Sequence, residues 1–150
     1  MEDISLHILD IAENSIRAKA KNINIMITED YKNDLLTLTI EDDGEGMDEA
    51  TKAFALNPFF TTKKGKKVGL GLALLAHSAE EAGGDMKIES EPGKGTKISA
   101  IFKLGHIDRK PLGNLNETIK CLKVTHPEIK LNSDYIKINN NGSNGNSYNK

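Results

Sequence analysis

Two polar side chains near the N-terminus, Asp10 and Asn14, have the spacing and chemistry of a reactive pair. They lie one turn apart on a predicted helix, so both project from the same face. The amide oxygen of Asn14 suits Mg²⁺, a hard cation that takes few protein ligands, and the carboxylate of Asp10 could orient or deprotonate a nearby water. A solvated polar helix face would produce the same pair, so the pair alone leaves both interpretations open.

A glycine-rich turn, Asp42-Asp43-Gly44-Glu45-Gly46, directly follows a predicted strand. Glycine permits backbone conformations that are closed to other residues, and the Asp42 carboxylate can accept a hydrogen bond from an exocyclic amine such as that of adenine. A plain β-turn that closes the strand is the alternative. A Ca²⁺ loop of the EF-hand type is excluded, because the helix–loop–helix spacing and the terminal Glu are absent.

A lysine-rich loop precedes the next long predicted helix. Its lysines come just ahead of Gly69-Leu70-Gly71-Leu72, where free N–H groups at a helix N-terminus could bind an anion and glycines could let the backbone approach a phosphate. The loop is neither a Walker A loop nor a Rossmann turn, because the required glycine-lysine order and a parallel βαβ unit are both missing. A solvated basic loop is the alternative. Near the C-terminal end of this region Gly95-Thr96 opens a predicted strand, where the Thr hydroxyl could face a ligand or bond to the backbone.

The elements that must position these residues follow from hydrophobic periodicity and turn signals. Asp3 can cap a helix whose apolar residues recur at i+4, and two alternating segments after it are expected to pair as a hairpin. The patterns predict helices over 4–18, 48–55 and 69–82 and strands near 23–27, 36–40, 86–88 and 98–102. This order of paired strands and helices is typical of an α+β, two-layer domain.

The composition changes after residue 105, which divides the chain into three expected parts. We predict one domain over 1–105, a C-terminal extension over 106–138 with a helix near 112–124 and a strand at 135–138, and a tail over 139–150. The tail consists mostly of Asn, Gly and Ser and cannot bury apolar surface, so we predict that it is disordered.

Length, charge and cysteine content exclude several classes of protein. The chain has 150 residues and a formal net charge of −2, so it suits one domain and neither a nucleic-acid coat nor an acidic-lipid binder. No apolar run approaches the roughly 20 residues needed to span a bilayer, and the acidic start is unlike a secretory signal. Cys121, the single cysteine, excludes an internal disulfide framework and a CxxC metal site. We therefore expect a cytoplasmic protein without membrane or nucleic-acid partners.

Taken in order, the motifs resemble the N, G1, F, G2 and G3 boxes of the histidine-kinase-like (GHKL) ATPase superfamily. The segments that carry the resemblance are Asn14, Asp42-x-Gly44-x-Gly46, Asn57-Pro58-Phe59-Phe60-Thr61-Thr62-Lys63, Gly69-Leu70-Gly71-Leu72 and Gly95-Thr96. The resemblance covers roughly residues 3–104 and looks closest to the catalytic domain of sensor histidine kinases. It implies the Bergerat ATP-binding fold, a two-layer α/β sandwich with a mixed, mostly antiparallel sheet and ATP held between the helices and a lid.

The resemblance also implies a role for each matching residue. Asn14 would ligate Mg²⁺, Asp42 would hold the adenine amine, and Thr96 would complete the adenine pocket through water. Asp10 is the candidate base, at a position where the hydrolytic and serine-kinase branches of the superfamily place a Glu. The other nucleotide-binding residues that the resemblance implies are Gly44, Gly46, Met47, Phe59, Thr62, Lys63, Gly69, Leu70, Gly71 and Leu72, with residues 57–68 as the lid.

Two functions from different classes fit this reading. The first is a stand-alone domain that hydrolyses ATP or transfers its γ-phosphate to a partner protein, in the manner of anti-sigma serine kinases or a split histidine kinase. None of the histidines has the context of a phospho-accepting His, so a self-contained histidine kinase is not expected. The second is a nucleotide sensor in which an ordered lid controls partner binding without chemistry. Asp10 favours the first function because a sensor needs no base; whether the chain forms a homodimer stays open.

Overall fold

The computed structural model describes residues 3–56, 70–139 and 144–149. The elements, in chain order, are α1 (Ile4–Arg17), β1 (Asn22–Asp30), β2 (Leu35–Asp42), α2 (Glu49–Leu56), α4 (Leu70–Glu81), β3 (Asp85–Ser90), β4 (Thr96–Lys103), α5 (Leu115–Thr125), β5 (Lys130–Ile138) and β6 (Asn144–Asn149). Within these residues no helix is both long and apolar enough to cross a bilayer.

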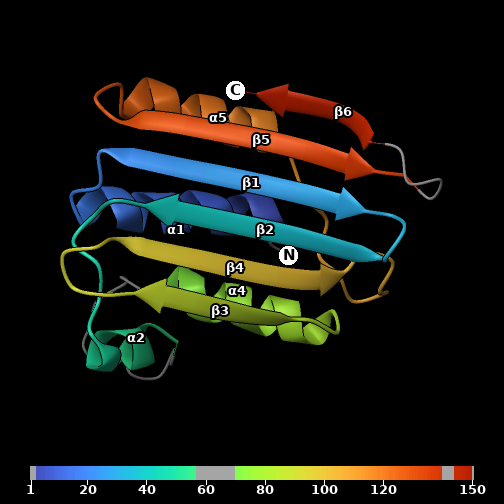
Figure 1. Cartoon of the computed structure of the whole chain (residues 1–150), viewed down its shortest axis with the longest axis horizontal. Helices are drawn as coiled ribbons and strands as arrows, with labels where there is room; N and C mark the ends of the chain where they lie inside the picture. The colour runs from blue at the N-terminus through green and yellow to red at the C-terminus, as the bar shows by residue number, and fades with distance from the viewer. Residues whose placement is uncertain (1–2, 57–69, 140–143, 150) are drawn as a thin grey trace.

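Within the described ranges, six strands form one sheet in the order β3-β4-β2-β1-β5-β6. Every neighbouring pair is antiparallel except β1 and β5, which run parallel. Helices α1, α4 and α5 lie behind one face of this sheet, and the opposite face is open (Figure 1). The predicted α+β sandwich with a mixed, mostly antiparallel sheet is therefore confirmed.

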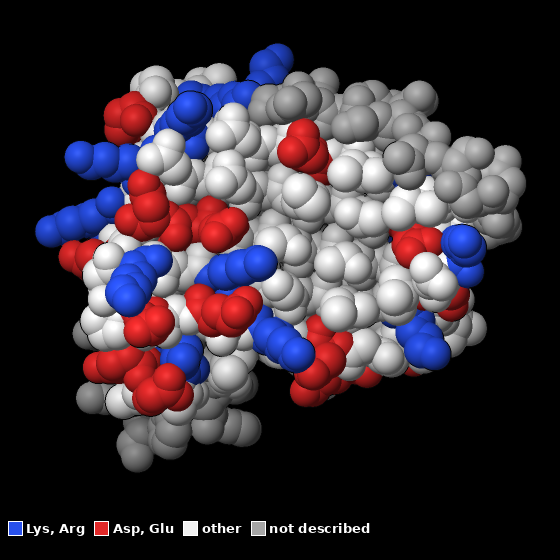
Figure 2. Space-filling view, in the orientation of Figure 1, with Lys and Arg blue, Asp and Glu red and all other residues white. Residues whose placement is uncertain are grey.

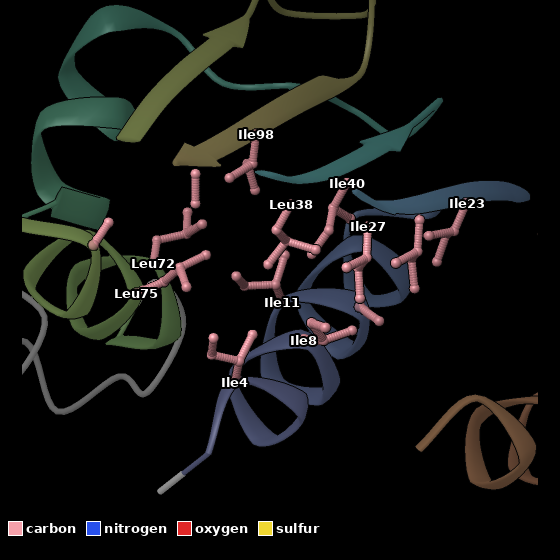
Figure 3. Packing of buried hydrophobic residues seen from close by; sticks show 14 of the residues in the cluster. Ile4, Ile8, Ile11, Ile23, Ile27, Leu38, Ile40, Leu72, Leu75 and Ile98 are labelled. Carbon is pink, nitrogen blue, oxygen red and sulfur yellow. The ribbon is translucent and has the colours of Figure 1, made fainter. Parts of the chain in front are cut away.

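Helix α1 forms where the predicted cap and apolar stripe coincide. The Asp3 carboxylate accepts hydrogen bonds from the Ser5 hydroxyl at 2.7 Å and the Leu6 N–H at 3.1 Å, which satisfies a donor that the first helical turn leaves free. Ile4, Ile8 and Ile11 are almost completely buried and point toward the strands and α4 (Figure 3). Each such side chain contributes about 1.5–3 kcal/mol through burial, so packing decides the position of this helix.

The strands alternate between a buried face and the open face. Along β1, Ile23, Ile25 and Ile27 are buried against the helices, and Asn24 and Met26 are exposed. Figure 2 looks onto the open face, where the centre of the sheet is mostly uncharged and the charged side chains gather toward its margins. The buried face of the sheet therefore packs against the helices, and the open face carries the exposed side chains.

The C-terminal extension is built into the same sheet. β5 pairs with β1 from Asn22↔Lys130 to Asp30↔Ile138, and α5 packs beside α1 with Ile119 buried. The extension strand predicted at 135–138 therefore begins earlier, at Lys130.

The prediction of a disordered tail does not hold for Asn144–Asn149, which form β6 on the outer edge of β5. An edge strand offers unpaired backbone N–H and C=O groups, and pairing with them needs no apolar side chains. The composition that argued for disorder therefore does not prevent a strand here.

Candidate functional site

The polar residues singled out by the sequence meet at one end of the sheet, where β2 ends and β4 begins. Asp42 and Thr96 are direct cross-strand partners there, and Asp42 also faces Ile23 at the start of β1. The C-terminal end of α1 adjoins this end of the sheet. The carbonyl of Ala18, the residue that follows α1, accepts a hydrogen bond from the Glu45 N–H at 2.8 Å. In Figure 1 this is the left-hand end of the sheet.

The Asp42 carboxylate is held in place by a donor on each oxygen. The Ser15 hydroxyl of α1 donates to Oδ2 at 2.6 Å, and the Gly44 N–H donates to Oδ1 at 2.8 Å. The side chain is half-buried, and each carboxylate oxygen retains a further lone pair. A fixed acceptor at this position can bind an amine without first losing side-chain freedom.

A chain of hydroxyl groups connects Thr96 to the turn after β2. Ser90 Oγ accepts from the Met47 N–H at 2.8 Å, donates to the Gly95 carbonyl at 2.9 Å and lies 2.8 Å from Thr96 Oγ1. Because the single Ser90 proton is used on Gly95, the Thr96 hydroxyl is the donor to Ser90. The lone pairs of Thr96 Oγ1 are then left to accept from water or a ligand.

Glycines let the two loops at this end pass each other at backbone contact distance. An ideal Cβ on Gly46 would lie 2.0 Å from the Glu91 carbonyl oxygen, and one on Gly95 would lie 2.1 Å from the Asp42 carbonyl oxygen. Both residues have positive φ angles, +74° and +81°. The glycines at 46 and 95 are therefore required by the geometry that brings Asp42 and Thr96 together.

Asp10 and Asn14 line the α1 side of the site. Asp10 is exposed, and an ideal Cβ on Gly71 would lie 2.9 Å from Asp10 Cβ, so the start of α4 packs closely against α1 here. Asn14 is half-buried, and its Oδ1 accepts a hydrogen bond from the Arg17 guanidinium. Among the described residues no cluster of His, Cys, Asp and Glu could hold a metal ion by itself.

The second aspartate of the turn, Asp43, points away from this site and anchors the turn to β1. It accepts hydrogen bonds from the N–H of Lys21 at 2.8 Å and from the N–H and side-chain amide of Asn22 at 2.9 and 2.7 Å. The side-chain hydrogen bond from Asn22, followed by these backbone donors, lowers the pKa of Asp43 from 3.8 to about 2. Asp43 is therefore a structural anion that holds its neighbour Asp42 in position.

The structure joins five of the predicted residues directly and leaves others outside the residues that it describes. Contacts at the strand end join Asp42, Gly44, Gly46, Met47 and Thr96. Asp10 contacts Gly71, and Asn14 precedes the Ser15 that bonds to Asp42, so their place at the site stays a prediction. The Leu72 side chain is buried in the core, so only its backbone is available to a ligand, and Leu70 begins α4. The predicted residues Phe59, Thr62, Lys63 and Gly69 and the predicted lid over 57–68 lie outside the described residues.

Sequence reasoning missed two positioning residues, Ser15 and Ser90. Ser15 did carry a signal, because it continues the buried stripe of Ile8 and Ile11 and so places a hydroxyl next to buried apolar side chains. A polar residue on such a stripe needs a buried partner. Ser90 ends a strand that alternates normally, and nothing in its sequence context distinguishes it.

Comparison with known proteins locates this arrangement within a family. Residues 2–106 match the family described as "Histidine kinase-, DNA gyrase B-, and HSP90-like ATPase". The chain is 35% identical over 103 residues to a putative sensor protein of Shewanella frigidimarina, covering 67% of this chain and 16% of that protein. It is 36% identical over 111 residues to the sensor protein kinase FleS of Pseudomonas aeruginosa, covering 73% and 27%. The chain thus spans less than a third of the length of these relatives.

A solved structure shares the fold. The full-length structure of ShkA in complex with AMPPNP superposes with a TM-score of 0.51 at 20% sequence identity, covering 65% of this chain and 20% of that one. At this level of identity the likeness concerns the fold alone.

Proposed function

Since this chain belongs to the family of histidine kinase-, DNA gyrase B- and HSP90-like ATPases, we propose that it binds Mg²⁺·ATP at the strand end that holds Asp42 and Thr96. We further propose that it hydrolyses the nucleotide or transfers the γ-phosphate to a partner protein. The relatives are sensor proteins and kinases of which this domain is a fraction, so the phospho-accepting group would come from elsewhere.

The observation that carries the proposal is the Asp42 carboxylate, fixed by Ser15 and Gly44 across from Thr96. An ionised carboxylate only accepts hydrogen bonds, and adenine presents an exocyclic amine as a donor. Guanine presents a carbonyl oxygen at the corresponding ring position, which a carboxylate would repel. The site should therefore prefer ATP to GTP.

The α1 side of the site supplies the polar groups for the phosphates. Asn14 would hold Mg²⁺ through its amide oxygen, and the ion would neutralise phosphate charge when bound. Binding in this way requires the Asn14 oxygen to leave or share its hydrogen bond with Arg17. The start of α4 adjoins Asp10, and the free N–H groups of that first turn favour an anion. Asp10 is the group that would take a proton from water or from an acceptor hydroxyl.

Calorimetric titration of the full chain with ATP and Mg²⁺ tests the binding step. Asp42→Asn is expected to abolish measurable binding, because it replaces one carboxylate oxygen by an amide NH₂ group. Asp85→Asn, which changes an exposed carboxylate on the edge strand β3, is the matched control and should bind as the wild type does. Unchanged ATP affinity in Asp42→Asn, or equal affinity for GTP and ATP in the wild type, would refute the assignment of Asp42.

Phosphate release from the same samples tests the chemical step. Asp10→Asn should retain nearly all ATP affinity and lose turnover, because an amide cannot accept the proton. Full turnover in this variant would rule out Asp10 as the base.

A nucleotide sensor is the second candidate function. Two properties of Asp10 favour it. The side chain is exposed to solvent, and it is one methylene shorter than the Glu that the hydrolytic branches of the superfamily have at this position. A sensor would bind ATP without releasing or transferring phosphate and would change its affinity for a partner protein. Partner capture with and without ATP, compared with phosphate release, separates this function from catalysis.

A further inference from the structure

A cavity lies toward the opposite end of the sheet from Asp42, and the described residues that line it all belong to the C-terminal extension. Its volume is about 530 Å³, within the range of about 300–1,000 Å³ that small-molecule sites occupy. The residues that line it come from three stretches of the extension: the segment before α5, the first turns of α5, and β5. They are Leu112, Gly113, Asn114, Leu115, Asn116, Ile119, Ser133, Asp134, Tyr135 and Lys137. The family match ends at residue 106, so these lining residues lie outside it.

The cavity has an apolar wall and one buried hydroxyl. Leu112, Leu115 and Ile119 form much of the wall on the helix side. Ser133 is only 3% exposed, and its hydroxyl makes no hydrogen bond to any residue in the described part of the chain. A hydroxyl that opens onto a cavity can bond to water there, and a ligand that accepts its proton can take the place of that water.

The first turn of α5 adds further donors beside this hydroxyl. Asn114 caps the helix, but its side chain accepts only from the Glu117 N–H, at 3.0 Å. The N–H groups of Leu115 and Asn116 have no acceptor within the helix, and both residues line the cavity. The helix dipole at this turn also favours a negative group.

The charges around the cavity leave room for an anion. Lys137 lines it and lies 4.0 Å from the Glu29 carboxylate, which is also hydrogen-bonded by the hydroxyls of Tyr31 and Tyr135. The negative charge of Glu29 is thus offset by two hydroxyl donors and by Lys137, whose positive charge is shared between Glu29 and the cavity. Asp134 follows Ser133 in the strand and so projects toward the opposite face of the sheet.

We propose that this cavity binds a small monocarboxylate with an apolar body. The carboxylate would accept hydrogen bonds from Ser133 Oγ and from the Leu115 and Asn116 N–H groups, in a lining that includes the cation of Lys137. The apolar body would lie against Leu112 and Ile119. The site does not depend on the proposed nucleotide function, because it shares no residue with the Asp42 end.

Titration of the ¹⁵N-labelled full chain with octanoate, followed by its amide spectrum, tests the proposal. Octanoate should produce saturable shifts at Leu115, Asn116 and Ser133 and leave Asp42 and Thr96 unshifted. Octanamide, which has the same chain but no charge, should bind about tenfold more weakly, since hydrogen bonds to a charged group are about twice as strong as neutral ones.

A pair of serine variants keeps the test specific. Ser133→Ala should weaken octanoate binding several-fold, whereas Ser99→Ala, a half-buried serine on the other face of the sheet, should leave it unchanged. The amide spectrum itself shows whether each variant is folded. Shifts that fail to saturate, equal binding of octanamide, unchanged affinity in Ser133→Ala, or shifts centred on Asp42 and Thr96 would each overturn the proposal.

Discussion

The Asp42 end of the sheet and the cavity beside β5 differ in whether their polar side chains are hydrogen-bonded within the protein. At the Asp42 end two functional side chains are bonded to another polar group of the protein: Asp42 to Ser15, and Thr96 to Ser90. In the cavity beside β5, by contrast, the hydroxyl of Ser133 opens onto the cavity and makes no hydrogen bond to another described side chain. A site whose groups are already bonded is fixed before its ligand arrives, so it can be selective at little entropic cost. A site with an unpartnered hydroxyl gains more from whatever ligand satisfies that group.

The two ends also differ in their place along the chain. The Asp42 end is built wholly from the segment that matches the family, and the cavity is built from residues that follow it. The two regions nevertheless share one sheet through the β1–β5 pairing. If they act independently, a substitution in one region should leave ligand binding in the other unchanged.

Gly95→Ala should have the largest effect, a loss of about 3 kcal/mol or more in the free energy of unfolding. The new Cβ would lie 2.1 Å from the Asp42 carbonyl oxygen at a φ of +81°, so the backbone must shift. Gly93→Ala is the matched control, because it has a φ of +79° in the same turn with nothing within 4 Å of the Cβ. The control should lose only about 1 kcal/mol, the cost of a left-handed backbone. Equal losses in denaturant unfolding would show that crowding at Gly95 is unimportant.

Gly113→Ala tests the other end and should cost about 2 kcal/mol. The φ of Gly113 is +81°, and a Cβ there would lie 2.4 Å from the Asp3 carboxylate, which would have to give up its cap on α1. A side-chain end moves more easily than a backbone, so the effect is smaller than at Gly95. Asp3→Ala removes the cap alone and should cost about 1 kcal/mol. ATP affinity should change in neither variant; a loss of affinity would mean that the two ends are coupled through α1.

The sequence predicted the parts of the fold that depend on local signals. Helix α1 followed from a cap and an apolar stripe, the β1–β2 hairpin from alternation, and the end of α4 from Gly83-Gly84. The grouping of Asn14 with Asp42 and Thr96 was inferred from residue types and a family resemblance. The structure makes Asp42 and Thr96 cross-strand partners, and the place of Asn14 beside them stays a prediction.

The parts that sequence reasoning missed depend on pairing between distant segments. The bond from Ser15 to Asp42 joins residues 27 positions apart, so neither partner is visible from local sequence. The start of β5 and the whole of β6 are polar, and their pairing rests on backbone hydrogen bonds that composition does not encode. Hydrophobic periodicity detects only strands that bury one face well.

Ser15→Ala should lower ATP affinity about fivefold, the size expected from one hydrogen bond to a charged group whose partner is lost. The Asp42 carboxylate would keep its bond to the Gly44 N–H but would rotate more freely. Calorimetry with Ser99→Ala as control measures the difference. An affinity equal to that of the wild type would mean that Gly44 alone fixes Asp42. Thr96 would then be the functional side chain at this end that a neighbouring side chain holds in place.

Asp43→Asn should have the smallest effect, a change in how thermal stability depends on pH. The pKa of Asp43 is lowered in the folded protein from 3.8 to about 2, so the unfolded chain takes up the proton first as the pH falls. The stabilisation from this carboxylate is therefore fully present above pH 4 and is lost as the pH falls through the interval from 3.8 to about 2. Melting temperatures should decline less steeply across that interval in Asp43→Asn than in the wild type, and Asp85→Asn serves as the control for removing an exposed carboxylate. Parallel curves for Asp43→Asn and the wild type would show that the bonds from Lys21 and Asn22 do not anchor the turn, and that Asp42 owes its position to Ser15 and Gly44 alone.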